Sequence, residues 1–112
     1  MLLNEIAEKT SGTVVVNIPG VEASCAYSSD LLSDVMGHCA DGAVLITIQN
    51  HLNTIAVCTL VGAGIIVICH GRPVPDDMAA AAKREGVAIV ATPLSQFEAS
   101  VRLSSLPASA KQ

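Results

Sequence analysis

The chain contains few aromatic and few charged residues. Aromatic residues make up 2% and charged residues 14% of the sequence, and tryptophan is absent. Because hydrophobic residues still amount to 51%, the core has to be built from Val, Ile, Leu and Ala. In an average soluble domain about a quarter of the residues are charged. The low fraction of charged residues in this chain therefore predicts that a partner covers part of its surface. We expect that partner to be a second copy of the chain, since symmetric homodimers are the commonest oligomers.

Basic runs and long apolar runs are also missing. The net charge is -4 with six basic residues, which excludes the basic patch that nucleic-acid binding requires. The longest weakly polar run, 55–69, contains Gly62 and Gly64 and is shorter than the roughly 18 residues of a membrane span. The amino terminus carries Glu5 and no basic start, unlike a signal peptide. We therefore expect a cytoplasmic protein that binds neither nucleic acid nor membrane.

No motif in the sequence identifies a catalytic function. The four cysteines, at 25, 39, 58 and 69, form no Cys-x-x-Cys pair, and we expect buried, reduced thiols instead of a metal site. A phosphate-binding Gly-x-x-x-x-Gly-Lys-Ser/Thr loop is absent, and 62–64 (Gly-Ala-Gly) precedes an apolar run instead of following one, unlike a dinucleotide fingerprint. No nucleophile elbow supports a Ser-His-Asp triad. The sequence therefore indicates no catalytic residue, and the cofactor, if any, is unknown.

The stretch 42–71 organises the rest of the chain. Its two continuous apolar runs, 43–48 and 65–68, are rich in β-branched residues, which is typical of strands buried on both faces of a helix-covered parallel sheet. The segment 52–61 between them predicts a crossover helix, of the length that a parallel connection needs. Five of its residues form one apolar stripe, the side that such a helix normally buries: Leu52, Ile55, Ala56, Thr59 and Leu60.

The remaining elements are predicted from caps, turns and apolar spacing. We expect an N-terminal helix within 1–12, a strand over 13–18, a weaker strand over 21–27, a helix over 78–85 ended by Gly86, and a strand over 87–91. Ser28-Ser29-Asp30 is expected to cap a helix that runs through Cys39. Thr92-Pro93 is expected to open a last helix with Leu94, Phe97 and Val101 on one face, and 104–112 to fray.

Together these elements predict one α/β domain over residues 1–112. It should have three layers, with a mostly parallel central sheet and crossover helices. In such a sheet, ligands bind beyond the carboxyl ends of the strands, and helix N-termini at that edge favour phosphate or carboxylate groups. The polar residues at these strand ends are the candidate ligand-binding residues: Ser28, Asp30, Gln49, His51, His70, Arg72, Thr92 and Ser95.

A second polar group lies on the predicted helix that ends at Cys39. Asp30, Asp34 and His38 are each four residues apart, so they share one helix face. One interpretation is a hydrated face with a weak Asp34–His38 pair; the other is the edge of a site that binds a cation or substrate. A three-histidine metal site would also need His51 and His70, which have no short paired spacing.

Three segments carry a resemblance to a known family. They are 30–36 (Asp-Leu-Leu-Ser-Asp-Val-Met), 46–49 (Ile-Thr-Ile-Gln) with His51, and Gly86-Val87 leading to 92–95 (Thr-Pro-Leu-Ser) and Phe97. Over roughly 20–103 the chain resembles the DRTGG-domain family, particularly its small stand-alone members labelled HPr-kinase-like. The chain lacks a literal Asp-Arg-Thr-Gly-Gly; its nearest stretch is 69–72 (Cys-His-Gly-Arg). The resemblance implies an α/β domain that commonly dimerises, that occurs fused to phosphotransacetylases and CBS-containing pyrophosphatases in a regulatory or structural role, and that has no kinase domain.

Three functional hypotheses follow. The first is a non-enzymatic, dimeric regulatory module that binds a small anionic ligand such as a nucleotide. The second is a structural partner in the assembly of a larger redox or metabolic complex. The third is a small metal-binding enzyme that uses Asp34, His38, His51 or His70. Since function depends on sites and not on folds, the structure has to discriminate among them.

Overall fold

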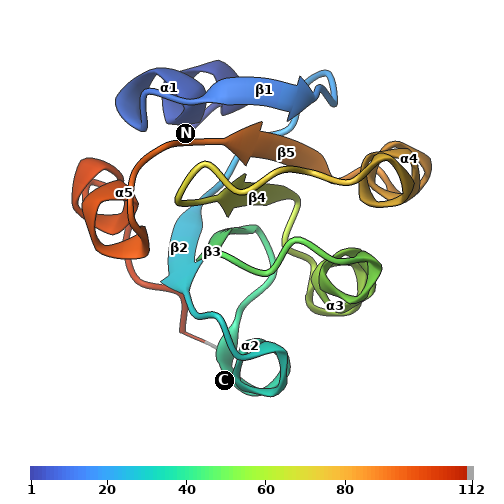
Figure 1. The fold of residues 1–112 in the computed structure, drawn as a ribbon. Coiled ribbons are helices and arrows are strands. Elements are labelled where there is room, and N and C mark those ends of the chain that lie inside the picture. The colour runs from blue at the N-terminus through green and yellow to red at the C-terminus, as the bar shows by residue number, and fades with distance from the viewer. Residues whose placement is uncertain (111–112) are drawn as a thin grey trace.

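One five-stranded sheet, in the order β1-β5-β4-β3-β2, forms the centre of the computed structural model, which describes residues 1–110 (Figure 1). Strands β2 to β5 run parallel to one another, and β1 pairs antiparallel with β5 at one edge. The strands are β1 (Thr13–Val16), β2 (Cys25–Ser28), β3 (Ala43–Thr47), β4 (Ile65–Ile68) and β5 (Ala88–Ala91).

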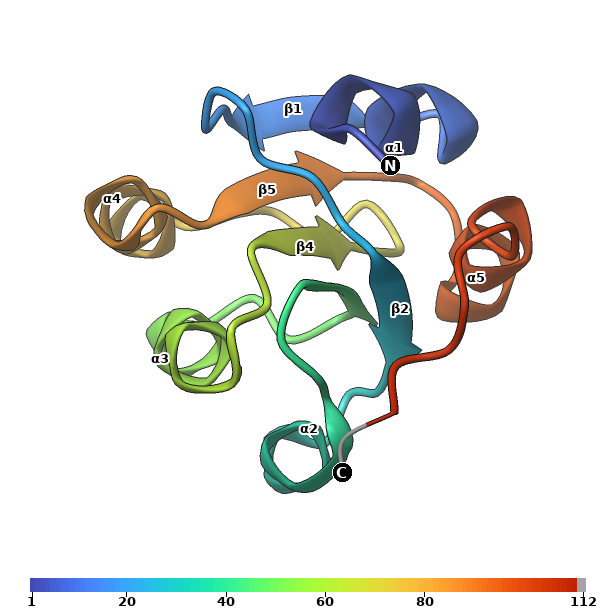
Figure 2. The same ribbon diagram turned by 180° about the vertical axis from the view of Figure 1, so that it is seen from behind.

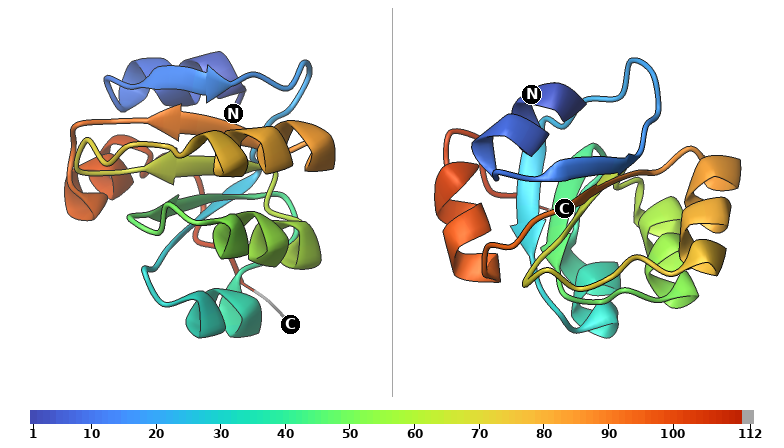
Figure 3. Two further views of the ribbon diagram at one scale, coloured as in Figure 1. Left: turned by 45° about the vertical axis from the view of Figure 1, so that its right-hand side comes forward. Right: turned by 45° about the horizontal axis from the view of Figure 1, so that its top comes forward.

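Helices cover both faces of this sheet, so the predicted three-layer α/β architecture is confirmed. They are α1 (Leu3–Lys9), α2 (Leu32–His38), α3 (Leu52–Val61), α4 (Asp76–Glu85) and α5 (Gln96–Arg102). The right-hand view of Figure 3 shows α1 and α5 on one side of the strands and α2, α3 and α4 on the other; Figure 2 shows the same arrangement from behind. Within residues 1–110, none of these helices combines the length and the apolar content needed to cross a bilayer.

Each strand sends alternate side chains into two separate apolar layers. Leu45 and Ile66 pack with Ile55 in the layer of α2, α3 and α4. Their neighbours Ile46 and Ile65 pack in the layer of α1 and α5. Every residue of β3 and β4 is buried, which is why these two strands are continuous apolar runs instead of alternating patterns.

Helix α3 buries a different side from the one that its apolar stripe predicts. Of the stripe, Ile55 alone is buried, whereas Leu52 is 45% and Leu60 is 70% exposed. The helix buries Thr54, Ile55, Cys58 and Val61 instead. The prediction fails because α3 carries no charged residue, so its sequence does not mark a solvent side. Thr54 can be buried because its hydroxyl donates to the Gln49 carbonyl, 2.8 Å away.

Helix α5 also differs from its prediction, in its start and in its buried side. Thr92-Pro93 lies in the preceding loop, and Ser95 is the N-cap: its hydroxyl accepts from the Glu98 N–H at 3.0 Å. Phe97 is 78% exposed, whereas Ala99 is buried against the sheet. The expected apolar face, which included Phe97, is therefore wrong; α5 packs against the sheet through small Ala99.

One further expectation near β2 differs from the structure. Ser28-Ser29-Asp30 does not cap α2: the Ser29 hydroxyl accepts the Leu31 N–H at 3.2 Å, which closes a turn before the helix. Part of the tail that the sequence predicts to fray from 104 onward is bonded to β2: the Ala26 N–H donates to the Pro107 carbonyl and the Ser109 N–H to the Ala26 carbonyl. These bonds cover part of the exposed edge of β2. Residues 111–112 of that predicted tail lie outside the described residues.

Candidate ligand-binding site

Four loops meet at the carboxyl ends of β2, β3, β4 and β5. Because these strands are parallel neighbours, their ends lie along one edge of the sheet, as the sequence predicts. Hydrogen bonds join each loop to the next along that edge. We call these loops, 28–31, 48–51, 69–75 and 92–95, the strand-end edge.

The loops after β3 and β4 are joined by Asn50. This side chain is only 8% exposed; its amide N–H donates to the Pro73 carbonyl at 2.7 Å, and its carbonyl oxygen accepts from Arg72 Nη2 at 3.2 Å. Asn50 thereby positions the guanidinium of Arg72 at the edge. The sequence pattern predicts Gln49 and His51 on either side of Asn50 but not Asn50 itself, because only the structure shows that Asn50 is buried and bonded.

The loops after β4 and β5 are joined through the backbone at His70 and Gly71. His70 N–H donates to the Leu94 carbonyl at 2.7 Å, and Gly71 N–H donates to the Thr92 carbonyl at 2.9 Å. His70 has a φ of 61°, a left-handed conformation that is uncommon for a residue with a Cβ. The two hydrogen bonds hold the backbone in this conformation, and the imidazole of His70 is left exposed.

The loop after β2 is joined to the edge by two glutamines. Gln49 Nε2 donates to the Asp30 carbonyl at 2.6 Å. Gln96, in the first turn of α5, reaches Ser28 Oγ with its Nε2 at 3.4 Å. The second contact was not predicted, because α5 begins later than its sequence signals indicate. With these contacts the strand-end edge is bonded from the β2 loop to the β5 loop.

The eight predicted residues divide into two groups by exposure. Five are exposed, and Gln49 and Ser95 are half-buried. Thr92 is 1% exposed; its hydroxyl donates to the Thr10 carbonyl and accepts the Leu94 N–H. Ser95 is occupied as the α5 cap. Thr92 and Ser95 therefore shape the loops, whereas the exposed residues available to a ligand are Ser28, Asp30, His51, His70 and Arg72.

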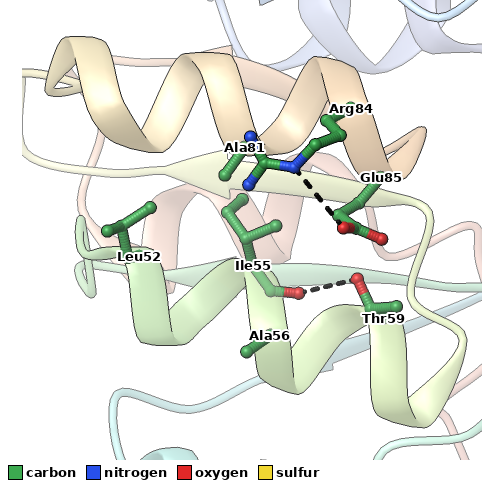
Figure 4. Close-up of a pocket in the computed structure, with 7 residues that line it drawn as sticks. All are labelled: Leu52, Ile55, Ala56, Thr59, Ala81, Arg84 and Glu85. Atoms are coloured by element: carbon green, nitrogen blue, oxygen red, sulfur yellow. Dashed lines mark hydrogen bonds and ion pairs between the residues drawn. The ribbon is translucent and has the colours of Figure 1, made fainter.

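Four hollows of the structure lie largely away from the strand-end edge. These four, in the described part of the chain, have volumes of about 210 to 400 Å³. Ser28 is the one predicted residue that lines any of these four, in a hollow of about 260 Å³ between β2, α5 and the segment that follows α5. A cleft of about 340 Å³ lies between α3 and α4, on the layer opposite α5 (Figure 4).

A separate polar cluster joins Tyr27, Asp34 and His38. Tyr27 Oη donates to Asp34 Oδ2 at 2.6 Å, and His38 Nδ1 lies 3.1 Å from Asp34 Oδ1. The Asp34–His38 pair matches the hydrated-face interpretation; the contribution of Tyr27 was not predicted. The hydrogen bond to Asp34 and burial raise the pKa of Tyr27 to about 12, and the same hydrogen bond lowers the pKa of Asp34.

Within residues 1–110 the candidate metal ligands lie apart, and the thiol of Cys69 is buried. Across residues 1–110, no three His, Cys, Asp or Glu side chains come together as a metal site would require. His38, His51 and His70 therefore do not gather into the three-histidine site considered from the sequence. Cys69, next to His70 in the chain, is fully buried, and burial raises its pKa to about 11. At neutral pH this thiol is protonated and a poor nucleophile.

Comparison with known proteins finds a similar fold but no similar sequence. No family model matches the chain, and no curated protein matches it. Its structure is similar to that of the CBS and DRTGG domains of the regulatory region of Clostridium perfringens pyrophosphatase, complexed with the activator diadenosine tetraphosphate. The TM-score is 0.71 at 15% sequence identity, over 94% of this chain and 47% of the other. The chain thus spans about half of that structure, and the likeness shows a DRTGG-like fold.

Proposed function

We propose that this chain is a non-enzymatic regulatory module that binds a small anionic ligand of the nucleotide class at the strand-end edge. The observation that carries the proposal is Arg72, which buried Asn50 holds at the edge, with the exposed imidazoles of His51 and His70 in the loops after β3 and β4. Arg72 uses one of its five N–H donors on Asn50. The other donors have no bonded partner within residues 1–110 and can form the forked, charge-assisted contacts that phosphate groups favour.

Helix α3 supports the same ligand class. It begins directly after the β3 loop, with His51 as N-cap, and has no acidic residue in its first turn. The positive end of its dipole is therefore not offset by a carboxylate of its own first turn. Helix α4, by contrast, begins with Asp76 and Asp77. An anion at the edge would be stabilised near the N-terminus of α3 and repelled by the two carboxylates at the N-terminus of α4.

The role and the ligand class of the structural neighbour support this proposal. That region of the pyrophosphatase is regulatory, and its structure contains a dinucleotide polyphosphate activator. The resemblance in sequence to the DRTGG family also implies a regulatory role. Further, we propose that the chain acts as a homodimer in the cytoplasm, where its four cysteines, which form no disulfide within residues 1–110, would stay reduced.

We expect a nucleotide to raise the thermal stability of the purified chain, and Arg72→Ala to remove most of that effect. A ligand at one hundred times its Kd adds about 2.7 kcal/mol of stability, which is about 10–20 °C in Tm for a domain of this size. Losing a hydrogen bond to a charged group costs about 1.5–3 kcal/mol, so Arg72→Ala should raise Kd by about 10- to 100-fold. A thermal-shift titration with ATP and diadenosine tetraphosphate measures both values.

Arg102→Ala is the matched control. It removes the same positive charge from the last turn of α5, where Arg102 is exposed and donates to the Lys9 carbonyl. Its Kd should stay within about twofold of the wild-type value. Equal weakening by both substitutions would indicate a general charge effect and contradict a site at Arg72.

A second candidate function is an assembly partner of a larger complex. Exposed apolar side chains in three parts of the chain favour it: Leu60 is 70%, Phe97 78% and Leu31 61% exposed, and apolar surface of this kind is where a partner protein can bind. Purification of the chain from its own cells would test it. Recovery of the chain with a stoichiometric second protein would favour assembly, and recovery of the chain alone would count against it.

A further inference from the structure

Helix α3 presents an outward apolar ridge. Leu52, Ala56 and Leu60 follow one another at intervals of four residues, and all three are exposed. Such a row is one of the ridges through which packed helices interdigitate. A helix that is apolar all round is normally buried all round, yet α3 buries one side only. The ridge therefore has the composition of a helix that a further element covers.

Beside this ridge lies the cleft between α3 and α4. Ile55 and Ala81, 2% and 4% exposed, form its floor, and Leu52, Ala56 and Thr59 line its α3 wall (Figure 4). Its volume is about 340 Å³, enough to receive side chains of a helix laid across it. The exposed ridge and the cleft next to it supply the projection and the recess that two packed surfaces need.

The ridge is symmetric about Ala56. Leu52 and Leu60 each lie four residues from Ala56, one toward each end of α3. A two-fold axis through Ala56 therefore brings Leu52 of one copy onto Leu60 of the other, and Leu60 onto Leu52. At the crossing point the two small Ala56 side chains permit a close approach of the helices. Each copy then contributes both the ridge and the cleft that receives the ridge of the other copy.

The charges around the cleft fit a second copy as well. Arg84 and Glu85, at the end of α4, are exposed and lie 3.8 Å apart between Nε and Oε1 on the rim. The rim thus carries one positive and one negative charge, and α3 carries none. Two identical surfaces of this kind meet with no net repulsion, and each Arg84 can find a Glu85 on the other copy.

We propose that α3 and the α3–α4 cleft form the two-fold interface of a homodimer, with Ala56 at the axis. This inference rests on the dimeric state in the proposed function and adds the surface that makes it. The interface lies on the helix layer opposite α5. No residue of the strand-end edge lines the cleft.

Leu60→Glu tests the interface by disruption. A carboxylate at the centre of an apolar contact, present twice in a two-fold dimer, should weaken dimerisation by at least about 100-fold. Light scattering after size exclusion then gives the monomer mass at concentrations where the wild-type chain is a dimer. Phe97→Glu is the matched control: it places the same charge at a site of similar exposure on α5 and should remain a dimer. Circular dichroism confirms that both variants are folded.

Ala56→Cys tests the interface by capture. Helices that cross at 8–10 Å bring the facing Cα atoms to about 4–5 Å, within reach of a disulfide. Mild oxidation should link Ala56→Cys into a covalent dimer on a non-reducing gel, whereas Phe97→Cys should stay monomeric on the same gel. Absence of the Ala56→Cys link in a wild-type-like dimer would overturn the placement of the axis.

The outcomes separate this interface from the function proposed above. A Leu60→Glu variant that remains dimeric would overturn the interface and leave the dimeric state standing. A wild-type chain that is monomeric at every concentration would overturn both, and would indicate a different protein as the occupant of the α3 surface. The Arg72→Ala titration decides ligand binding in either case, because Arg72 lies outside the cleft.

Discussion

Ile66→Ala is expected to cost about 2–5 kcal/mol of folding free energy, whereas Phe97→Ala, which removes a larger side chain, should cost less than about 0.5 kcal/mol. Ile66 is fully buried in β4, at the middle of the sheet, and packs in the layer of α2, α3 and α4. Its truncation loses apolar burial and leaves a cavity that the flanking strands cannot fill. Phe97 is 78% exposed and buries little when the chain folds.

Urea unfolding followed by circular dichroism measures both free energies. A small domain has roughly 5–15 kcal/mol of stability in total, so Ile66→Ala should move the midpoint far toward low urea, with an unchanged slope. Phe97→Ala should almost overlay the wild-type curve. If Phe97→Ala were as damaging as Ile66→Ala, Phe97 would have to pack against the sheet, and the position of α5 would be wrong.

Tyr27 is expected to ionise with a pKa of about 12, well above the ordinary value of about 10. The first cause is the hydrogen bond that the phenol donates to Asp34, which favours the neutral form; burial and the negative charge of Asp34 act in the same direction. Tyr27 is the only tyrosine and the chain has no tryptophan. The near-ultraviolet absorbance of tyrosinate therefore reports this one group.

Asp34→Asn should bring the Tyr27 pKa back toward about 10, since it removes the charge and the strongest acceptor. His38→Ala is the control: His38 contacts Asp34 but is not among the causes of the raised Tyr27 pKa, so the midpoint should stay near 12. A wild-type midpoint of about 10, with circular dichroism showing a folded chain, would mean that the Tyr27–Asp34 bond does not persist in solution.

The same shift has a defined effect on stability. Because the folded state raises the pKa of Tyr27, the stabilisation is fully present below pH 10 and is lost as pH rises from 10 through about 12. The Asp34 pKa is lowered in the folded state, so its contribution is present above the unfolded value of 3.8 and is lost as pH falls through the folded value. Stability from this cluster is therefore retained through the neutral range.

The sheet could be predicted from the sequence because its signals are local and strong. The apolar runs that become β3 and β4 are bounded by glycine and polar residues, and continuous burial on two faces has one common architecture. The convergence of the loops after β3, β4 and β5 follows from parallel order alone. This part of the site therefore depends on topology, which the sequence pattern determines.

The buried faces of α3 and α5 could not be predicted in the same way. In α3 the apolar residues surround the helix, so that burial of Thr54 and Cys58 in place of Leu60 depends on the neighbouring strands. In α5 the largest side chain, Phe97, is turned outward, and small Ala99 makes the contact with the core. Apolar character alone predicts that Phe97 is buried. It carries no information on how close the helix lies to the sheet, and at this distance the small Ala99 side chain makes the contact.

The contact between Asn50 and Arg72 also could not be predicted from the sequence. The two residues are 22 positions apart, and their pairing depends on the register of β3 against β4 and on the turn at His70. Each is unremarkable in its own segment. The role of Asn50 in positioning Arg72 follows only from its burial and its hydrogen bonds. The sequence pattern therefore predicts Arg72 as a ligand-binding residue but not Asn50.

Binding of an anionic ligand at the strand-end edge can be tested directly. The most direct test is an amide ¹⁵N–¹H spectrum of the full chain during titration with ATP and then diadenosine tetraphosphate. We expect the largest shift changes at residues 49–51 and 70–72, and their loss in Arg72→Ala. Changes confined to the α3–α4 cleft, or a spectrum that neither nucleotide alters, would contradict binding at this edge.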